Sequence, residues 1–163
     1  MKAKILLAAA ALGIAIAAAF ALAPRPIAPE ARFAALSGEK FTTSDLRGKV
    51  VLVNFWATWC TICVQEMPKM IDTYRKFAPR GYEMVAVAMQ SDHPNAVAEF
   101  TQRRALPFKV ALDGDGDIAR QFGRVRITPT SFLIDKSGRV LKEYVGEPDW
   151  AEFHALVEKA LSS

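Results

Sequence analysis

The stretch Val50–Pro68, VVLVNFWATWCTICVQEMP, holds both cysteines of this 163-residue chain. It opens with a nearly continuous apolar run, which is typical of a central β-strand covered on both faces. Cys60 and Cys63 follow at once, and a helix is expected from about Cys60 to Ala78, bent at Pro68 because proline cannot donate a backbone hydrogen bond. A strand that leads into a helix through Cys-x-x-Cys decides both the fold and the chemistry of the chain.

Three uses of the cysteine pair need to be compared. Structural zinc takes four protein ligands, and this chain offers one cysteine pair and two histidines far apart in sequence, His93 and His154. A copper site that borrows a histidine or a methionine remains an alternative. A disulfide used as a staple stabilises little, because the loop it closes has two intervening residues. Reversible thiol-disulfide exchange is favoured.

The position of the pair supports exchange. Cys60 is expected at the start of the helix, where free backbone N–H groups and the helix dipole stabilise a thiolate. Cys63 lies one turn further on and is expected to be more buried. The thiolate is the attacking species in exchange, so Cys60 is predicted to attack and Cys63 to resolve.

The N-terminus predicts export. Lys2 and Lys4 precede an uncharged run of 19 residues, 5–23, which as a helix would span roughly 28 Å, close to the hydrocarbon thickness of a bilayer. We interpret residues 1–23 as a signal peptide or, preferably, an uncleaved signal anchor, with the rest of the chain outside the cytoplasm. Residues 24–32 are rich in proline and predict an extended linker, followed by one domain over residues 33–163.

The remaining chain alternates strand and helix patterns. A turn at Ser37–Gly38 predicts an N-terminal hairpin, and apolar runs predict strands around YEMVAVAMQ and FKVALD, with a helix at NAVAEFTQRRA between them. TSFLID and VLKEYVG predict a hairpin, and an amphipathic helix follows Pro148. The expected class is α/β, with a mixed central sheet flanked by helices. With a net charge of +4 and no basic cluster interleaved with aromatics, nucleic-acid binding is not expected.

These motifs resemble the thioredoxin superfamily. The segments WCTIC, after VVLVNFWAT, and ITPTSFLID, with Pro129, carry the likeness. The added Glu66-Met67-Pro68, the N-terminal apolar run and the long stretch between Cys63 and Pro129 look like membrane-anchored thiol-disulfide oxidoreductases of the TlpA/ResA type. The resemblance implies a thioredoxin-like fold with an extra strand–helix unit, supplied by YEMVAVAMQ and NAVAEF.

The resemblance also implies roles for individual residues. Cys60 is expected to be the nucleophile and Cys63 its resolving partner, and together they would form the redox-active disulfide. Pro129 matches the cis-proline opposite that disulfide, and Thr128 would offer backbone groups to an extended substrate. Glu66, three residues after Cys63 on the same helix, is expected to accept the proton of Cys63.

Other residues near the pair are expected to modify the chemistry. Trp56 and Trp59 would shield the site and form its lip, although Trp56 also fits a core position and Trp59 a surface one. Asn54 stands where thioredoxins carry a buried acid, which makes Glu66 the substitute proton acceptor. The dipeptide between the cysteines, Thr61-Ile62, lacks the histidine of strong oxidants and so favours a reductant.

Two other features of the sequence do not support calcium binding or peroxide reduction. DGDGD, residues 113–117, lacks the glycine and the acid of an EF-hand at the required spacing and predicts a turn before a short helix. A peroxiredoxin would need Ser or Thr where Ala57 stands. His93 and His154 are interpreted as surface residues. We expect no cofactor and no metal.

The sequence therefore predicts an extracytoplasmic thiol-disulfide oxidoreductase, with disulfide-bearing proteins as substrates and a membrane protein as electron donor. The resemblance implies that it reduces cysteines of apocytochrome c or of a copper site. Two alternatives remain open: an oxidant that makes disulfides, and a copper-binding or chaperone module that uses the same cysteines.

Overall fold

The computed structural model describes residues 25–163 of the chain. Its centre is a five-stranded sheet with the strand order β5-β4-β3-β6-β7, and β1 and β2 form a separate hairpin. The strands are β1 (Arg32–Ala34), β2 (Lys40–Thr42), β3 (Val50–Trp56), β4 (Tyr82–Ala88), β5 (Lys109–Leu112), β6 (Thr130–Ile134) and β7 (Val140–Val145). The helices are η1 (Ser44–Leu46), α2 (Thr61–Phe77), η2 (Ala78–Arg80), α3 (Pro94–Arg104), α4 (Asp117–Gln121) and α5 (Trp150–Ser162).

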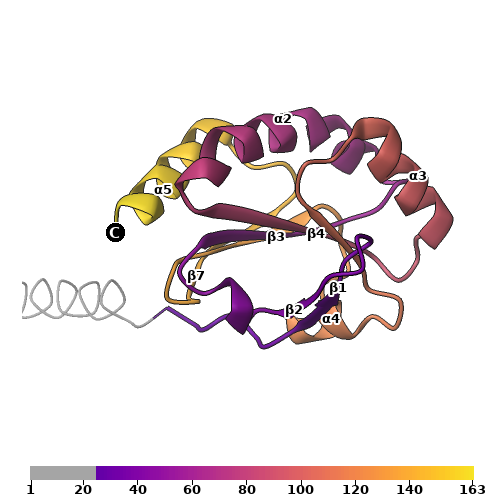
Figure 1. The fold of residues 1–163 in the computed structure, drawn as a ribbon, viewed down its shortest axis with the longest axis horizontal. Helices are drawn as coiled ribbons and strands as arrows, with labels where there is room; N and C mark the ends of the chain where they lie inside the picture. Colours follow the sequence, from indigo (N-terminus) through magenta and orange to yellow (C-terminus); the bar gives the residue numbers. More distant parts are fainter. Residues whose placement is uncertain (1–24) are drawn as a thin grey trace, which may run out of the picture.

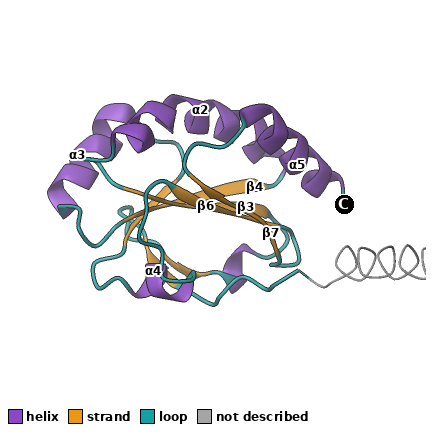
Figure 2. Cartoon of the chain, turned by 180° about the vertical axis from the view of Figure 1, so that it is seen from behind, coloured by secondary structure: helices purple, strands orange, loops and turns teal. Residues whose placement is uncertain are grey.

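The sheet is mixed and covered on both faces. Strands β3, β4 and β5 run parallel, and β6 runs antiparallel to both β3 and β7. Helices α2, α3 and α5 lie over one face, while α4 and the β1–β2 hairpin lie under the other, as the opposite views in Figures 1 and 2 agree. The predicted α/β class and thioredoxin-like arrangement are confirmed.

Strand β3 explains the apolar run that precedes the cysteines. Side chains alternate across a strand, so Leu52 and Trp56 pack in the core under α2 and α5. Val53 and Phe55 face the opposite core, beside α4 and the hairpin. Both faces are therefore apolar, except that Asn54 points toward the α2 side and is fully buried.

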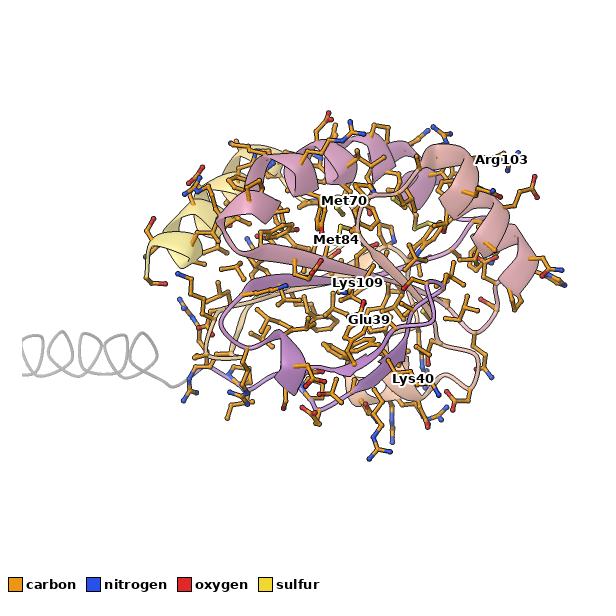
Figure 3. All side chains as sticks on the ribbon, viewed as in Figure 1. Glu39, Lys40, Met70, Met84, Arg103 and Lys109 are labelled. Atoms are coloured by element: carbon orange, nitrogen blue, oxygen red, sulfur yellow. A yellow bond between two sulfur atoms is a disulfide. The ribbon has the colours of Figure 1, made fainter. Side chains whose placement is uncertain are left out.

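Helix α2 carries the cysteines and packs along the sheet. Met70 of α2 and Met84 of β4 both lie in the layer between helix and sheet, where each is at most 1% exposed (Figure 3). Pro68 lies inside α2 and removes one N–H donor from its backbone ladder. The C-terminal helix α5 begins at Asp149, whose side chain caps it by accepting from the Glu152 N–H.

The β1–β2 hairpin is attached to the edge strand β5. Ala35 pairs with Ala111 across an isolated antiparallel bridge, and Lys109 forms an ion pair with Glu39 near the hairpin turn (Figure 3). The hairpin therefore covers part of the β5 edge of the sheet. An uncovered edge strand could pair with strands of other chains.

The segment before β1 also packs on the domain. Val140 N–H donates to the Pro26 carbonyl, Ala28 N–H donates to the Gly138 carbonyl, and Ala31 is fully buried. The segment expected as a linker therefore lies against the β6–β7 turn at Pro26 and Ala28. The backbone of Ala31 forms hydrogen bonds with Thr43. This contact fixes where the chain enters the domain.

No helix within residues 25–163 is long and apolar enough to cross a membrane. The predicted signal or anchor segment, residues 5–23, lies outside the described residues.

Candidate active site

The two cysteines sit where β3 gives way to α2. Cys60 is the N-cap of α2, and its sulfur accepts a hydrogen bond from the Cys63 N–H at 3.2 Å. The two residues are joined in a disulfide with their Cα atoms 5.3 Å apart. Cys60 is 7% exposed and Cys63 is fully buried. Cys60 is thus the more accessible sulfur and occupies the helix start that stabilises a thiolate.

Asp92 braces the loop that leads to Cys60. Its carboxylate accepts from the Thr58 N–H at 2.5 Å and from the Thr58 hydroxyl at 2.7 Å. The Met89 N–H donates to the Trp56 carbonyl at 3.0 Å, which joins the ends of β4 and β3. Sequence reasoning missed Asp92, although an acid just after a strand parallel to β3 must lie at the same sheet edge as Cys60.

Glu66 lies one turn beyond Cys63 and is 1% exposed. Asn54 donates from Nδ2 to Glu66 Oε1 at 3.4 Å and to Ser131 Oγ at 2.9 Å. Among the described residues, Glu66 Oε2 and Asn54 Oδ1 have no hydrogen-bond partner. The hydrogen bond between Asn54 and Glu66 shows that the two side chains lie in the same buried space. A glutamate on α2 can therefore stand near the place of the buried acid that thioredoxins carry on the strand.

Burial changes the acidity of Glu66. Removal from water, assisted by the negative charge of Glu147, raises the pKa of Glu66 from 4.5 to about 8. The Asn54 hydrogen bond and the positive charge of Lys69 oppose the rise. At neutral pH the carboxyl is mostly protonated, so it can exchange a proton in the range where thiols do.

Pro129 lies beside the end of β3. The Thr128–Pro129 peptide bond is cis, as the resemblance implied. Phe55 of β3 pairs with Thr130 of β6, so the next position back along β6, Pro129, lies where β3 ends and the chain turns toward Cys60. The Pro129 carbonyl accepts from the Gly146 N–H at 2.8 Å.

Thr128 is half-buried, and its backbone groups have no hydrogen-bond partner within residues 25–163. Free backbone groups beside a buried proline are available to pair with an extended chain.

Apolar side chains surround the cysteines at the surface. Trp59, Ile62 and Ile127 are 60%, 47% and 63% exposed. Trp56 is fully buried and packs on Phe100 with ring centroids 5.1 Å apart. Of the two tryptophans, Trp59 therefore belongs to the surface lip and Trp56 to the core.

His154 and the aspartate turn serve the fold, whereas His93 is exposed, as expected. His154 is half-buried, with Nε2 2.9 Å from Thr73 Oγ1 and its ring 5.5 Å from that of Phe77, so its interpretation as a surface residue was wrong. The reason is that this side of α5 packs on α2. Asp113 is buried and accepts from the N–H groups of Ile118 and Ala119, which makes it the brace of a turn.

Metal ligands do not cluster in the described part of the chain. Residues 25–163 contain no group of three His, Cys, Asp or Glu side chains placed to hold an ion.

This arrangement defines a class of protein. A cysteine pair at the N-terminus of a helix, reached from a central strand and placed beside a cis-proline, is the site of a thioredoxin-like thiol-disulfide oxidoreductase. The family model described as Redoxin matches residues 24–159 of the chain. The chain belongs to this family.

Individual relatives agree with the assignment. A thiol-disulfide oxidoreductase ResA from Bacillus thuringiensis subsp. konkukian is 39% identical over 125 residues, which are 76% of this chain and 70% of that protein. The ResA of Geobacillus thermodenitrificans is 38% identical over 147 residues, 87% of this chain and 83% of that one. A crystal structure of a thiol:disulfide interchange protein of the thioredoxin family from Chlorobium tepidum superposes with a TM-score of 0.77 at 31% identity, covering 85% of this chain and 98% of that one. The protein is a thiol-disulfide oxidoreductase similar to ResA.

Proposed function

We propose that this protein is an extracytoplasmic reductant of disulfides in other proteins. The Cys60 thiolate attacks a substrate disulfide, forms a bond to one substrate sulfur and expels the other as a thiolate. The Cys63 thiol then loses its proton and attacks the Cys60 sulfur. The substrate leaves with two thiols, and its two electrons have come from the cysteine pair, which is now a disulfide.

The observation that carries the proposal is the surroundings of Cys63. Its sulfur is fully buried among apolar side chains, and the nearest ionisable group along the helix is the Glu66 carboxyl. An apolar setting beside an acid disfavours a thiolate. Oxidising power in this class comes from a stabilised reduced form. Here only Cys60 has the helix start to stabilise its thiolate, Cys63 is buried, and no histidine lies between them, so the pair favours giving electrons away.

Glu66 has a role in the resolving step of this mechanism. Cys63 must deprotonate inside a space closed to water, and Glu66 is the buried acid one turn away. Only the ionised form of the carboxyl can accept the proton. A pKa of about 8 leaves a minor ionised fraction at neutral pH and makes that fraction a stronger base than a carboxylate in water. Glu66 is therefore assigned as proton acceptor, with Thr128, Pro129 and Trp59 as the surface on which the substrate lies.

Substrates and location come from the resemblance of the chain to the TlpA/ResA type. We propose that the substrates are cysteines of apocytochrome c before haem attachment, or cysteines of a copper site. Residues 5–23 would anchor the chain in the membrane, with Lys2 and Lys4 on the cytoplasmic side. A membrane protein would re-reduce the cysteine pair, because a reductant must be recharged after each turnover.

The equilibrium reduction potential of the Cys60–Cys63 pair tests the proposal. The full-length protein is equilibrated in glutathione or dithiothreitol buffers, and the fraction of free thiol is read by alkylation. A reductant should give a potential near that of thioredoxin, about −270 mV, or lower. A potential near −120 mV would identify a disulfide-forming oxidant and refute the proposed direction. The Cys60→Ser/Cys63→Ser variant provides the unreactive baseline.

A further inference from the structure

A groove lined by arginines opens at the same edge of the sheet as the cysteines. It has a volume of about 410 Å³, and the residues that line it include Gln90 after β4 and Arg120, Arg124 and Arg126. This volume falls in the range of sites that hold small ligands or side chains. The groove lies on the α4 side of the sheet, opposite the helix that carries the cysteines.

The groove is positively charged. Arg120 is held by an ion pair with Asp117 and donates to the Asp115 carbonyl. Arg124 and Arg126 have no acidic partner among residues 25–163. The one carboxylate in the lining, Asp113, is 2% exposed and both its oxygens accept backbone N–H groups. Two guanidinium groups are therefore free to bind an anion.

The backbone at Arg124 is unfavourable for an arginine. Its φ is 62°, directly after Gly123 at 88°, and left-handed backbone favours glycine. The Arg124 N–H donates to the Arg120 carbonyl, a bond that glycine would make equally well. A strained backbone at a non-glycine residue is a reason to look for a function of its side chain, and the position of Arg124 in the groove suggests anion binding.

The groove shares its loop with the surface on which the substrate is proposed to lie. Arg126 is two residues before Thr128, whose free backbone groups are available to an extended chain. An extended chain advances about 3.3 Å per residue, so a substrate paired with Thr128 carries residues two to four positions from its reacting cysteine past Arg126. Those residues can place their side chains in the groove.

We propose that this groove selects substrates with acidic residues close to the target cysteine. Asp or Glu two to four positions away would bind Arg124 and Arg126, while the sulfur itself is positioned over Cys60. This inference rests on the proposed function, since it assigns a substrate class to that same site.

Two disulfide peptides test the inference. They share one intramolecular disulfide and differ at two flanking positions, which are Glu in one and Gln in the other. The rate of reduction by the reduced full-length protein should be about tenfold higher for the Glu peptide at low salt, as expected for two ion pairs at a partly enclosed surface. The advantage should shrink in 0.5 M salt.

Two double variants separate the effect of the groove arginines from the effect of the net charge of the protein. Arg124→Gly/Arg126→Gln should bring the rate for the Glu peptide to within twofold of the rate for the Gln peptide measured with the same variant. Glycine accepts the left-handed backbone, so this variant should melt no lower than the wild type. The control, Arg75→Gln/Arg103→Gln, removes the same charge from exposed positions on α2 and α3 (Arg103 is labelled in Figure 3) and should keep the full advantage.

The outcomes distinguish this inference from the proposed function. Equal reduction of both peptides by the wild type would overturn the groove assignment and leave disulfide reduction intact. If neither peptide is reduced, the reductant proposal fails. The role of the groove is then tested separately, by measuring how tightly each peptide binds. Fluorescently labelled Glu and Gln peptides with serine in place of cysteine would then be compared by anisotropy. Tighter binding of the Glu peptide that is lost in Arg124→Gly/Arg126→Gln supports the groove, and equal binding overturns it.

Discussion

Replacing Glu66 by Gln should raise the stability of the protein at neutral pH and flatten its dependence on pH. Burial raises the pKa of Glu66 from 4.5 to about 8, so the folded state holds a proton that the unfolded state has released. Between these two values the free energy of unfolding falls by up to about 1.4 kcal/mol per pH unit as pH rises. At pH 7 the accumulated cost is roughly 3 kcal/mol.

Glutamine is neutral in both states and carries no such cost. Its buried amide leaves N–H groups without partners, which costs about 1 kcal/mol. The net gain of Glu66→Gln is therefore expected to be roughly 2 kcal/mol at pH 7, and near pH 4.5 the variant should be no more stable than the wild type.

Urea unfolding of the oxidised protein at pH 5, 6, 7 and 8, followed by tryptophan fluorescence, measures this. Burial lowers the pKa of His154, so that group makes stability rise with pH, opposite in sign to Glu66. Subtracting the profile of the variant from that of the wild type cancels His154 and isolates Glu66. Glu143→Gln, at an exposed position on β7, is the matched control and should leave the profile unchanged.

Parallel profiles for the wild type and Glu66→Gln between pH 5 and 8 would refute the reasoning. They would mean that the Glu66 carboxyl ionises as easily in the folded as in the unfolded chain. The proton-acceptor role of Glu66 would then lose its basis.

Three further results are expected. Cys63→Ser should leave substrates covalently attached through Cys60 on non-reducing gels, whereas Cys60→Ser should trap none; a copper module would lose metal and trap nothing in either variant. Asp92→Asn weakens the charged hydrogen bonds to Thr58 by roughly 1–2 kcal/mol, so the Thr58 amide should exchange its hydrogen faster, as measured by mass spectrometry. An unchanged exchange rate would show that Asp92 does not hold this loop. Phe153→Ala empties a fully buried site and should lower the free energy of unfolding by about 3–5 kcal/mol in urea; a loss below 1 kcal/mol would show that α5 contributes little to the core.

The central part of the fold could be predicted because its signals are local. The run Val50–Trp56 is apolar at every position but Asn54, and its short length and content of valine and aromatic residues indicate a strand with cores on both faces. The burial of Cys63 and the direction of Glu66 follow from helical spacing, since residues three apart share one face.

Other features depend on contacts between distant segments and could not be predicted. Asp92 meets Thr58 because β4 lies beside β3 in parallel register, which the local sequence at either position does not state. The docking of residues 26–31 depends on backbone hydrogen bonds of Pro26 and Ala28 to the β6–β7 region and of Ala31 to Thr43. The half-burial of His154 depends on how α5 crosses α2. In each case the deciding quantity is the placement of one element against another.

The arrangement separates reactivity from substrate choice. Glu66 and Asn54 lie on the α2 side of the sheet, beneath the cysteines, where burial from water governs proton transfer. Arg124 and Arg126 line the α4 side at the same edge, where charge governs what is bound. In the proposed mechanism, the strand end at Pro129 is the point where both sides would meet a substrate. Since the sheet stands between the two sets and they share no partner, changes in one should leave the effect of the other nearly unaltered.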